Sequence, residues 1–160
     1  MINIINIIMI NIPKTVNDPF YRYKRPIIEI EKQKNGSKVK NLNALAKSMY
    51  LEDSTIIRFL QKKLGCQSKE DILLKKDVNV DKLDNLFEEL VLLLICVECN
   101  NPEMQVCKEN QDTSIKCLAC GNSRVIDSSL SKLLIDEIDQ SKKKNKIATF
   151  MDDFDLNFSI

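Results

Sequence analysis

The 160-residue sequence contains no histidine and no tryptophan, and it has only 3 glycines. The absence of histidine excludes serine–histidine and cysteine–histidine hydrolase schemes, imidazole ligands for a metal, and a histidine-based pH switch. With so little glycine there is hardly any material for a phosphate-binding loop, and neither a Walker motif nor a GxGxxG motif occurs. We therefore expect a protein that is not an enzyme and has no catalytic site of its own.

Long apolar runs and strong net charge are also missing. The apolar stretch in LFEELVLLLI is far shorter than the roughly 20 residues that a membrane-spanning helix needs. The N-terminal MINIINIIMINIP is interrupted by asparagine and has no charged region before its apolar part, which argues against a signal peptide. A net charge of +1 argues against a uniformly basic nucleic-acid binder. These features predict a cytoplasmic protein that does not bind a membrane. In the cytoplasm thiols stay reduced.

The sequence nevertheless has 6 cysteines, and four of them form two CxxC pairs, Cys96–Cys99 and Cys117–Cys120, with 17 residues between the pairs. This spacing is typical of zinc sites in which two tight turns complete a tetrahedron of thiolates. Gly121 follows the second pair, where such a turn often needs left-handed backbone. Four buried cysteines or a redox pair are the less favoured alternatives. Because four protein thiolates leave no open position, the predicted Zn²⁺ is structural.

The rest of the chain predicts an α+β fold. Apolar spacing indicates a strand in PIIEIE, a helix in NLNALAKSMY, a helix that Ser54 caps and Gly65 ends, and a hairpin in DILLKKDVNV. A strong helix from Asp81 would run straight into Cys96, and SLSKLLIDEI would form a last helix after the ribbon strands MQVCK, TSIKC and RVID. We expect a flexible arm over 1–19, an α/β domain over 20–95, a zinc ribbon with its terminal helix over 96–139, and a mobile tail over 140–160.

The stretch DPFYRYKRP places Arg22 between Tyr21 and Tyr23. Its alternation of aromatic and basic residues suits an edge strand that Pro26 closes. The same stretch opens a basic region, because residues 20–40 carry seven cationic side chains against Glu29 and Glu31. Such a region can attract phosphate or an acidic partner, and it can equally be a solvated face. The seven are Arg22, Lys24, Arg25, Lys32, Lys34, Lys38 and Lys40.

Taken together, NIPKTVNDPFYRYKRP, CVECNNPE and CLACG resemble the N-terminal domain of the eukaryotic translation initiation factor 5 family, over about residues 9–139. The resemblance implies an α/β domain similar to initiation factor 1, followed by a zinc ribbon with four cysteine ligands. It also implies a monomer that activates the GTPase of initiation factor 2, in a complex with GTP, initiator tRNA and the small ribosomal subunit, during start-codon selection. Arg22 would be an arginine finger supported by Tyr21 and Tyr23. Lys24, Lys38 and Arg58 would contact tRNA or ribosomal RNA.

The chain departs from that family in several places. Arg25 stands where the family has methionine, Lys14 stands where arginine is common, and the loop EKQKNGSK is shortened. The family's C-terminal HEAT-repeat domain is not found, so we expect a short form, either a natural minimal protein or a truncated one. Residues 1–8 would be an extension. Two alternatives stay open: a component like the β subunit of initiation factor 2, although the lysine blocks of that subunit are missing here, and a zinc-ribbon RNA-binding module without an activator role.

Overall fold

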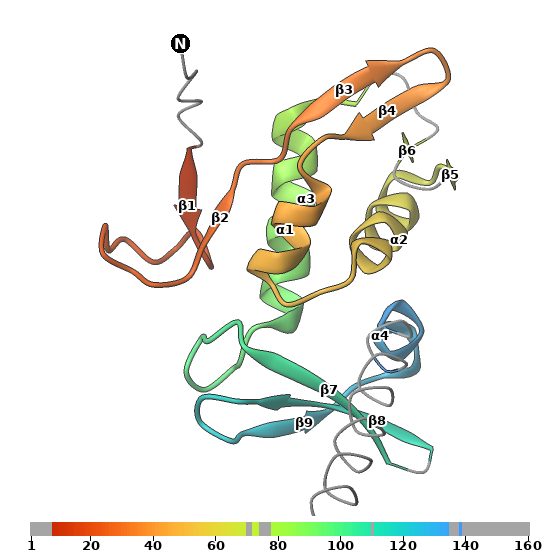
Figure 1. The fold of residues 1–160 in the computed structure, drawn as a ribbon. Coiled ribbons are helices and arrows are strands. Elements are labelled where there is room, and N and C mark those ends of the chain that lie inside the picture. The colour runs from red at the N-terminus through yellow and green to blue at the C-terminus, as the bar shows by residue number, and fades with distance from the viewer. Residues whose placement is uncertain (1–7, 70–71, 74–77, 110, 135–137, 139–160) are drawn as a thin grey trace, which may run out of the picture.

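The computed structural model describes residues 8–69, 72–73, 78–109, 111–134 and 138. It confirms the α+β class, with helices packed beside antiparallel sheets and a small all-antiparallel unit at one end (Figure 1). The elements in chain order are β1 (Met9–Asn11), β2 (Lys24–Pro26), β3 (Ile30–Gln33), β4 (Gly36–Val39), α1 (Leu42–Ser48), α2 (Asp53–Leu64), β5 (Ser68–Lys69), β6 (Ile72–Leu73), α3 (Val80–Leu94), β7 (Met104–Glu109), β8 (Asp112–Cys117), β9 (Ser123–Val125) and α4 (Ser128–Leu133).

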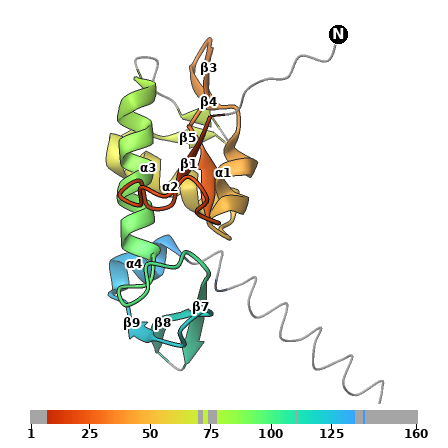
Figure 2. The ribbon, with the colours of Figure 1, turned by 90° about the vertical axis from the view of Figure 1, so that its left-hand side faces the viewer.

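Helix α3 connects the two parts of the molecule. The side chain of Asn79 caps its start by accepting a hydrogen bond from the backbone N–H of Asp81 at 2.7 Å, so the helix begins one residue before the predicted position. Its apolar stripe is buried, and it ends at Leu94, two residues before Cys96. Figure 2 shows α3 running from the α/β part down into the ribbon of β7, β8 and β9. The predicted direct connection between helix and ribbon is therefore confirmed.

A single apolar core extends through both parts. Leu94 and Ile95 at the end of α3 pack in the same cluster as Val106 and Ile115 of the ribbon and Leu134 after α4. Polar contacts add to this joint, since Lys62 of α2 donates to the Ser129 hydroxyl at 2.8 Å and Arg124 donates to the Leu93 carbonyl. The ribbon is thus packed onto the α/β part as well as linked to it, and the exact domain boundaries stay a prediction.

Three local predictions need correction. Helix α2 begins at Asp53 with Glu52 at its N-cap, so Ser54 lies inside the helix and does not cap it, whereas Gly65 ends it in the left-handed conformation as predicted (φ 61°). The predicted strand PIIEIE is interrupted between β2 and β3. There the backbone forms hydrogen bonds with the Asn41 side chain in place of a neighbouring strand. Its amide donates to the Ile27 carbonyl at 2.7 Å, and its oxygen accepts from the Glu29 N–H at 2.9 Å. The β5–β6 hairpin begins earlier than predicted, at Ser68.

The N-terminal segment also differs from the prediction of an arm. Strand β1 pairs antiparallel with β2, in the register Met9↔Pro26 and Asn11↔Lys24, and Ile12 is part of the core with 0% exposure. Residues 9–12 therefore lie against the domain, because β1 has β2 as a hydrogen-bonding partner and the Ile12 side chain is buried. Only the last three residues of DPFYRYKRP are strand, so Arg22 lies in the loop between β1 and β2. The predicted tail over 140–160 lies outside the described residues.

Candidate metal centre and arginine loop

The four predicted ligands Cys96, Cys99, Cys117 and Cys120 come together, and all their Sγ atoms lie within 4.8 Å of one another. The closest pairs join the two turns, with Cys96 to Cys120 at 3.5 Å and Cys99 to Cys117 at 3.6 Å. A tetrahedron with Zn–S bonds of about 2.3 Å has sulfurs about 3.8 Å apart, so the arrangement fits zinc. The cluster can hold a metal ion through four thiolates.

The two CxxC turns have the same backbone conformation. In each turn the N–H four residues after the first cysteine donates to that cysteine's carbonyl at 3.0 Å, from Asn100 to Cys96 and from Gly121 to Cys117. Asn100 and Gly121 are both left-handed, with φ of 55° and 78°. The glycine was predicted from its position. Asn100 was missed, although asparagine is the other residue that tolerates this conformation, and it stands at the equivalent position of the first pair.

The thiols differ in acidity because their neighbours differ. Burial alone would raise the pKa of Cys96, but the backbone N–H groups of Cys99 and Glu98 donate to its sulfur and lower the pKa to about 7. At Cys99 the N–H of Asn101 lowers the pKa, but desolvation and the neighbouring sulfurs outweigh it and raise the pKa to about 12. A bound cation would supply the positive charge that lets all four sulfurs stay deprotonated together.

The arginine loop, defined here as residues 12–23, presents Arg22 to solvent beside an aromatic pair. The Arg22 guanidinium carbon lies 5.5 Å from the centroid of the Tyr23 ring, and the Tyr21 ring packs edge-on against Tyr23 with centroids 5.9 Å apart. The Tyr23 hydroxyl donates to Oε1 of Glu103 at 2.6 Å, and this bond raises the Tyr23 pKa. Among the described residues Arg22 forms no ion pair, so its charge is available to a partner.

Polar side chains of the hairpin satisfy the carbonyls of the arginine loop. The Asn11 amide donates to the carbonyls of Val16 and Asp18 at 2.7 and 2.8 Å. The Lys24 ammonium, predicted as a nucleic-acid contact, donates to the Pro19 carbonyl at 2.6 Å. The loop is therefore held in one shape by its own hydrogen bonds, and Lys24 is one of the side chains that hold it.

Comparison with known proteins places this sequence in a family. A family model described as a domain found in initiation factors 2B and 5 matches residues 13–123, a range that includes Arg22 and all four clustered cysteines. The chain belongs to this initiation factor 2B/5 domain family. Family membership at this level confirms the resemblance that the two CxxC pairs and the tyrosine-flanked arginine suggested.

Curated relatives of this member of the 2B/5 domain family carry the name of initiation factor 5. Eukaryotic translation initiation factor 5 of Caenorhabditis elegans is 29% identical over 128 residues, which are 74% of this chain and 29% of the relative. The probable factor 5 of Schizosaccharomyces pombe is 29% identical over 86% of this chain and 38% of its own length. The probable factor 5-2 of Arabidopsis thaliana is 31% identical over 81% and 33%. The chain thus spans about a third of the length of these relatives.

Arg25, one of the departures from the family pattern, is fully buried. Its Nη1 donates to Oδ1 of Asp84 at 2.7 Å, its Nη2 donates to Oε2 of Glu88 at 3.1 Å, and its guanidinium carbon lies 4.8 Å from the centroid of the Phe87 ring. The Lys14 ammonium completes the cluster at 2.5 Å from Oδ2 of Asp84. Arg25 therefore fastens the hairpin to α3, and it does not belong to the exposed basic region predicted for residues 20–40.

The other two predicted nucleic-acid contacts lie on separate elements of this family member. Lys38 is half-buried on β4, opposite Glu31 of β3 and Ile72 of β6. Arg58 lies in the middle of α2, where its Nη1 donates to the Leu133 carbonyl at 2.8 Å. Arg58 thus helps hold α4 against α2, a role that the sequence did not indicate. Contact of either residue with RNA stays a prediction.

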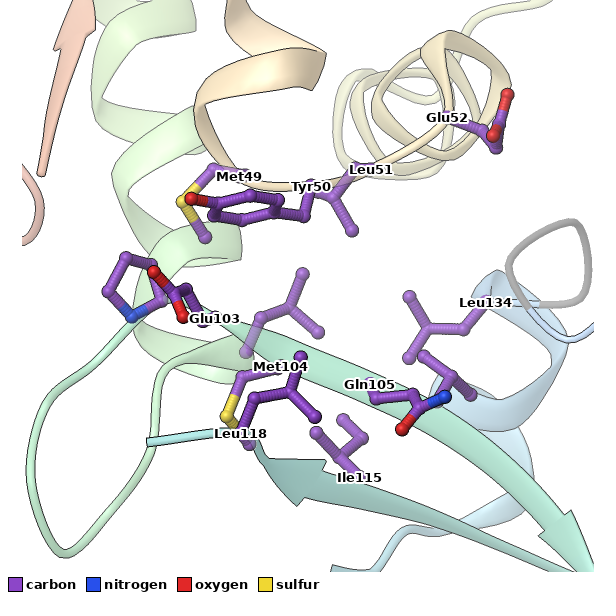
Figure 3. Close-up of a pocket in the computed structure, with 13 residues that line it drawn as sticks. Met49, Tyr50, Leu51, Glu52, Glu103, Met104, Gln105, Ile115, Leu118 and Leu134 are labelled. Carbon is purple, nitrogen blue, oxygen red and sulfur yellow. The ribbon is translucent and has the colours of Figure 1, made fainter. Parts of the chain in front are cut away.

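A groove of about 540 Å³ lies between the α1–α2 connection and the ribbon. Figure 3 shows Tyr50 on one side of it and Leu118 and Met104 on the other, with Glu103 near one end. Its lining is mainly apolar.

Among the described residues, no helix is both long enough and apolar enough to cross a membrane.

Proposed function

We propose that this chain is a translation initiation factor that activates the GTPase of initiation factor 2 in the small-subunit preinitiation complex. The observation that carries the proposal is Arg22, a solvent-exposed guanidinium on a hydrogen-bonded loop, backed by the Tyr23 ring. Three relatives that cover most of this chain are named as initiation factor 5, two of them as probable. The chain would act in the cytoplasm as a monomer, with initiator tRNA and the small subunit as its other partners.

The chemistry of GTP hydrolysis explains why a single arginine would suffice. As water attacks, negative charge spreads over the γ-phosphate oxygens and the leaving group. A guanidinium offers planar donors that match those oxygens, and it remains protonated at any cellular pH. The chain would contribute this group in trans and would need no catalytic site of its own. Tyr21 and Tyr23 would support the arginine through their rings, since an uncharged ring does not compete with the phosphate for the guanidinium charge.

We assign Zn²⁺ to the four-cysteine cluster as a structural ion. Cys96, Cys99, Cys117 and Cys120 would hold it, and their spacing and chemistry support the assignment. The ion would link the β7–β8 hairpin to the end of α3 and would take no part in chemistry, because all four ligands are protein thiolates. Placing zinc there also explains why four thiols lie so close together in a chain without histidine.

The plain RNA-binding alternative has less support, because the basic region is weaker in the folded chain than in the sequence. Arg25 lies inside the protein with Asp84 and Glu88, and Lys24 bonds a carbonyl of its own loop. A role like that of the β subunit of initiation factor 2 would leave Arg22 without a function in hydrolysis. Mutation of Arg22 therefore separates the activator role from both alternatives.

The decisive experiment is single-turnover GTP hydrolysis by the complex of initiation factor 2, GTP and initiator tRNA on small subunits, at saturating concentrations of this chain. Arginine fingers are worth about 10³–10⁵ in rate in related GTPases, so Arg22→Ala should lose most of the stimulation. Arg22→Lys should also lose most of it, because an ammonium cannot reproduce the planar fork. Lys47→Ala, which removes an exposed charge on α1, is the matched control. Full stimulation by Arg22→Ala would overturn the proposal.

A further inference from the structure

The arginine loop is bonded directly to the first cysteine turn, although the two are about 80 residues apart in the sequence. The Tyr23 hydroxyl donates to Oε1 of Glu103 at 2.6 Å, with a sequence separation of 80, and it accepts from the Asn101 amide at 3.1 Å. Asn101 and Glu103 follow Cys99 in the chain. Both hydrogen-bonding capacities of the tyrosine hydroxyl are therefore used by the ribbon.

The partners of Tyr23 are themselves fixed by the cysteine turn. The backbone carbonyl of Asn101 accepts from the Cys96 N–H at 3.1 Å. The side-chain oxygen of Asn101 accepts from the Glu103 N–H at 2.7 Å. The Glu103 carbonyl accepts from the Leu118 N–H at 2.9 Å, which ties it to the second cysteine turn. A continuous set of hydrogen bonds thus leads from the cysteine cluster to the ring on which Arg22 lies.

The opposite end of the same hairpin has a separate attachment. Arg25 of β2 and Lys14 near the start of the arginine loop bind Asp84 and Glu88 on α3, a helix that contributes no partner to the Tyr23 hydroxyl. This ion cluster fixes the base of the hairpin. The main chain around Arg22 is held by hydrogen bonds from the Tyr21 N–H to the Asp18 carbonyl at 3.1 Å and from the Ile12 N–H to the Tyr23 carbonyl at 3.0 Å. Among the described residues, the hydroxyl contacts of Tyr23 are the side-chain hydrogen bonds that join this stretch to the ribbon.

We propose that Tyr23, Glu103 and Asn101 are positioning residues that make the first cysteine turn part of the activating apparatus. The turn holds the Tyr23 hydroxyl, the Tyr23 ring supports the guanidinium, and Arg22 is presented to the GTPase in a fixed place. This inference rests on the proposed function for its consequence in hydrolysis. The structural coupling itself, between ribbon and arginine loop, does not depend on that function.

Fixed placement matters because an arginine finger acts through preorganised charge. A misplacement of about 1 Å can cost a reaction roughly 10²-fold in rate. Tyr23→Phe keeps the ring and the cation–π contact but removes the hydroxyl. The loop then loses its side-chain hydrogen bonds to the ribbon, while its own hydrogen bonds, the fold and the cysteine cluster stay intact. We expect the rate at saturating chain to fall between about tenfold and a hundredfold. The half-saturating concentration should rise as well, because a GTPase that binds a less ordered loop has to order it.

The first test measures amide hydrogen exchange of the whole chain, without any GTPase. Residues 19–24 should exchange faster in Tyr23→Phe and in Glu103→Ala than in wild type, whereas amides of β7 and β8 and the zinc content should not change. Glu103→Gln is the matched control, because its amide oxygen still accepts from the tyrosine hydroxyl, and it should behave like wild type. Unchanged exchange in both Tyr23→Phe and Glu103→Ala would overturn the coupling.

The second test measures hydrolysis with the same variants. Tyr23→Phe and Glu103→Ala should lower the saturated rate, and adding Tyr23→Phe to Arg22→Ala should cause no further loss, because the hydroxyl acts only through Arg22. A further loss in the double variant would overturn the positioning role. Failure of wild type to stimulate hydrolysis would refute the proposed function but not the coupling, which the exchange measurement decides separately.

Discussion

Arg25 keeps its charge inside the protein because its partners replace the water that it has lost. Asp84 accepts hydrogen bonds from both terminal nitrogens of Arg25, at 2.7 and 3.3 Å. Glu88 accepts from Nη2 of Arg25 at 3.1 Å, and the Pro26 carbonyl accepts from Nη1 at 3.2 Å. Only Nε finds no partner among the described residues. Removing one member of such a cluster leaves the others buried and unpaired, which is costly.

Replacing Arg25 with methionine, the residue that the resemblance would place there, should therefore destabilise this chain. The expected loss is about 3–5 kcal/mol in the free energy of unfolding, measured by urea denaturation. Asp84 and Glu88 would lose the guanidinium and would keep, among the described residues, Lys14 and the Ile28 N–H. Lys40→Met is the control, since it breaks an exposed pair with Glu29 at 3.8 Å and should cost at most about 1 kcal/mol. Equal small losses in the two variants would contradict the buried network.

The same cluster predicts a dependence of stability on acid. Desolvation alone would raise the pKa of Asp84, but the hydrogen bonds from Arg25 and Lys14 outweigh it and lower the pKa to about 2. Because the folded-state pKa lies below the unfolded value of about 3.9, the contribution is present above about pH 4 and is lost as pH falls toward 2.

That contribution should amount to about 2 kcal/mol. The measurement compares wild type with Asp84→Asn in urea from about pH 6 down to about pH 2.5. The difference between the two proteins should be constant at the upper end and shrink below about pH 4. Because metal release by acid is common to both proteins, it cancels in the difference. A difference that does not change with pH would show that Asp84 is not the titrating group.

At the scale of elements, Arg58 joins two helices whereas Lys38 lies on strand β4. Mutating them should therefore change different properties, the stability of the fold for Arg58 and the affinity for small subunits for Lys38. Arg58 donates to the Leu133 carbonyl, so Arg58→Ala should lower stability by about 1 kcal/mol and speed exchange in α4. If Lys38 meets phosphate as the resemblance implies, Lys38→Ala should weaken binding to small subunits and reduce the salt slope by about 1. Unchanged small-subunit affinity over a salt series would remove Lys38 from the predicted interface.

Elements with a strong local signal were predictable. The buried stripe of α3 repeats at helical spacing, and the cysteine ligands lie in two short motifs, so both could be predicted from nearby residues. Contacts between distant residues could not. The break between β2 and β3 depends on the Asn41 side chain, 12 residues away from Glu29, and the bond from Tyr23 to Glu103 joins positions 80 apart.

The seven basic residues of 20–40 illustrate the same limit on charges. Nothing local distinguishes Arg25, which is buried with α3, from Arg22, which is exposed three residues earlier in the chain. The difference arises because β2 pairs with β1 and turns one side chain toward Asp84 of a helix 59 residues away. Sequence alone could therefore count the charges but could not assign them to a surface.

At the scale of the whole molecule, the shared core predicts the effect of metal removal. Structural zinc contributes roughly 10–16 kcal/mol of apparent binding free energy in small domains. Because Leu94, Ile95 and the ribbon residue Ile115 pack in one cluster, losing the ribbon should also expose the end of α3. Chelation, or Cys117→Ser, should therefore lower the melting temperature of the whole chain and speed amide hydrogen exchange in β7 and β8.

The chain supplies a control for that measurement. Cys107 is half-buried on β7, outside the four-cysteine cluster, so Cys107→Ser should retain one zinc per chain and the wild-type melting temperature. Metal analysis of protein purified without chelators decides the first point. Protein that contains no zinc and melts like the chelated form would contradict the assignment of the metal.

The bond between Tyr23 and Glu103 has a thermodynamic consequence that runs in the opposite direction. Coupling free energies between two binding sites are reciprocal. If the cysteine turn holds the arginine loop in place for a GTPase, then a GTPase that grips the loop must strengthen the hold of the turn on its metal by the same factor. Zinc transfer to a chromogenic chelator should therefore be slower in the bound complex than in the free chain. Tyr23→Phe should erase that difference. The rate of zinc transfer would then report whether a GTPase is bound at the arginine loop.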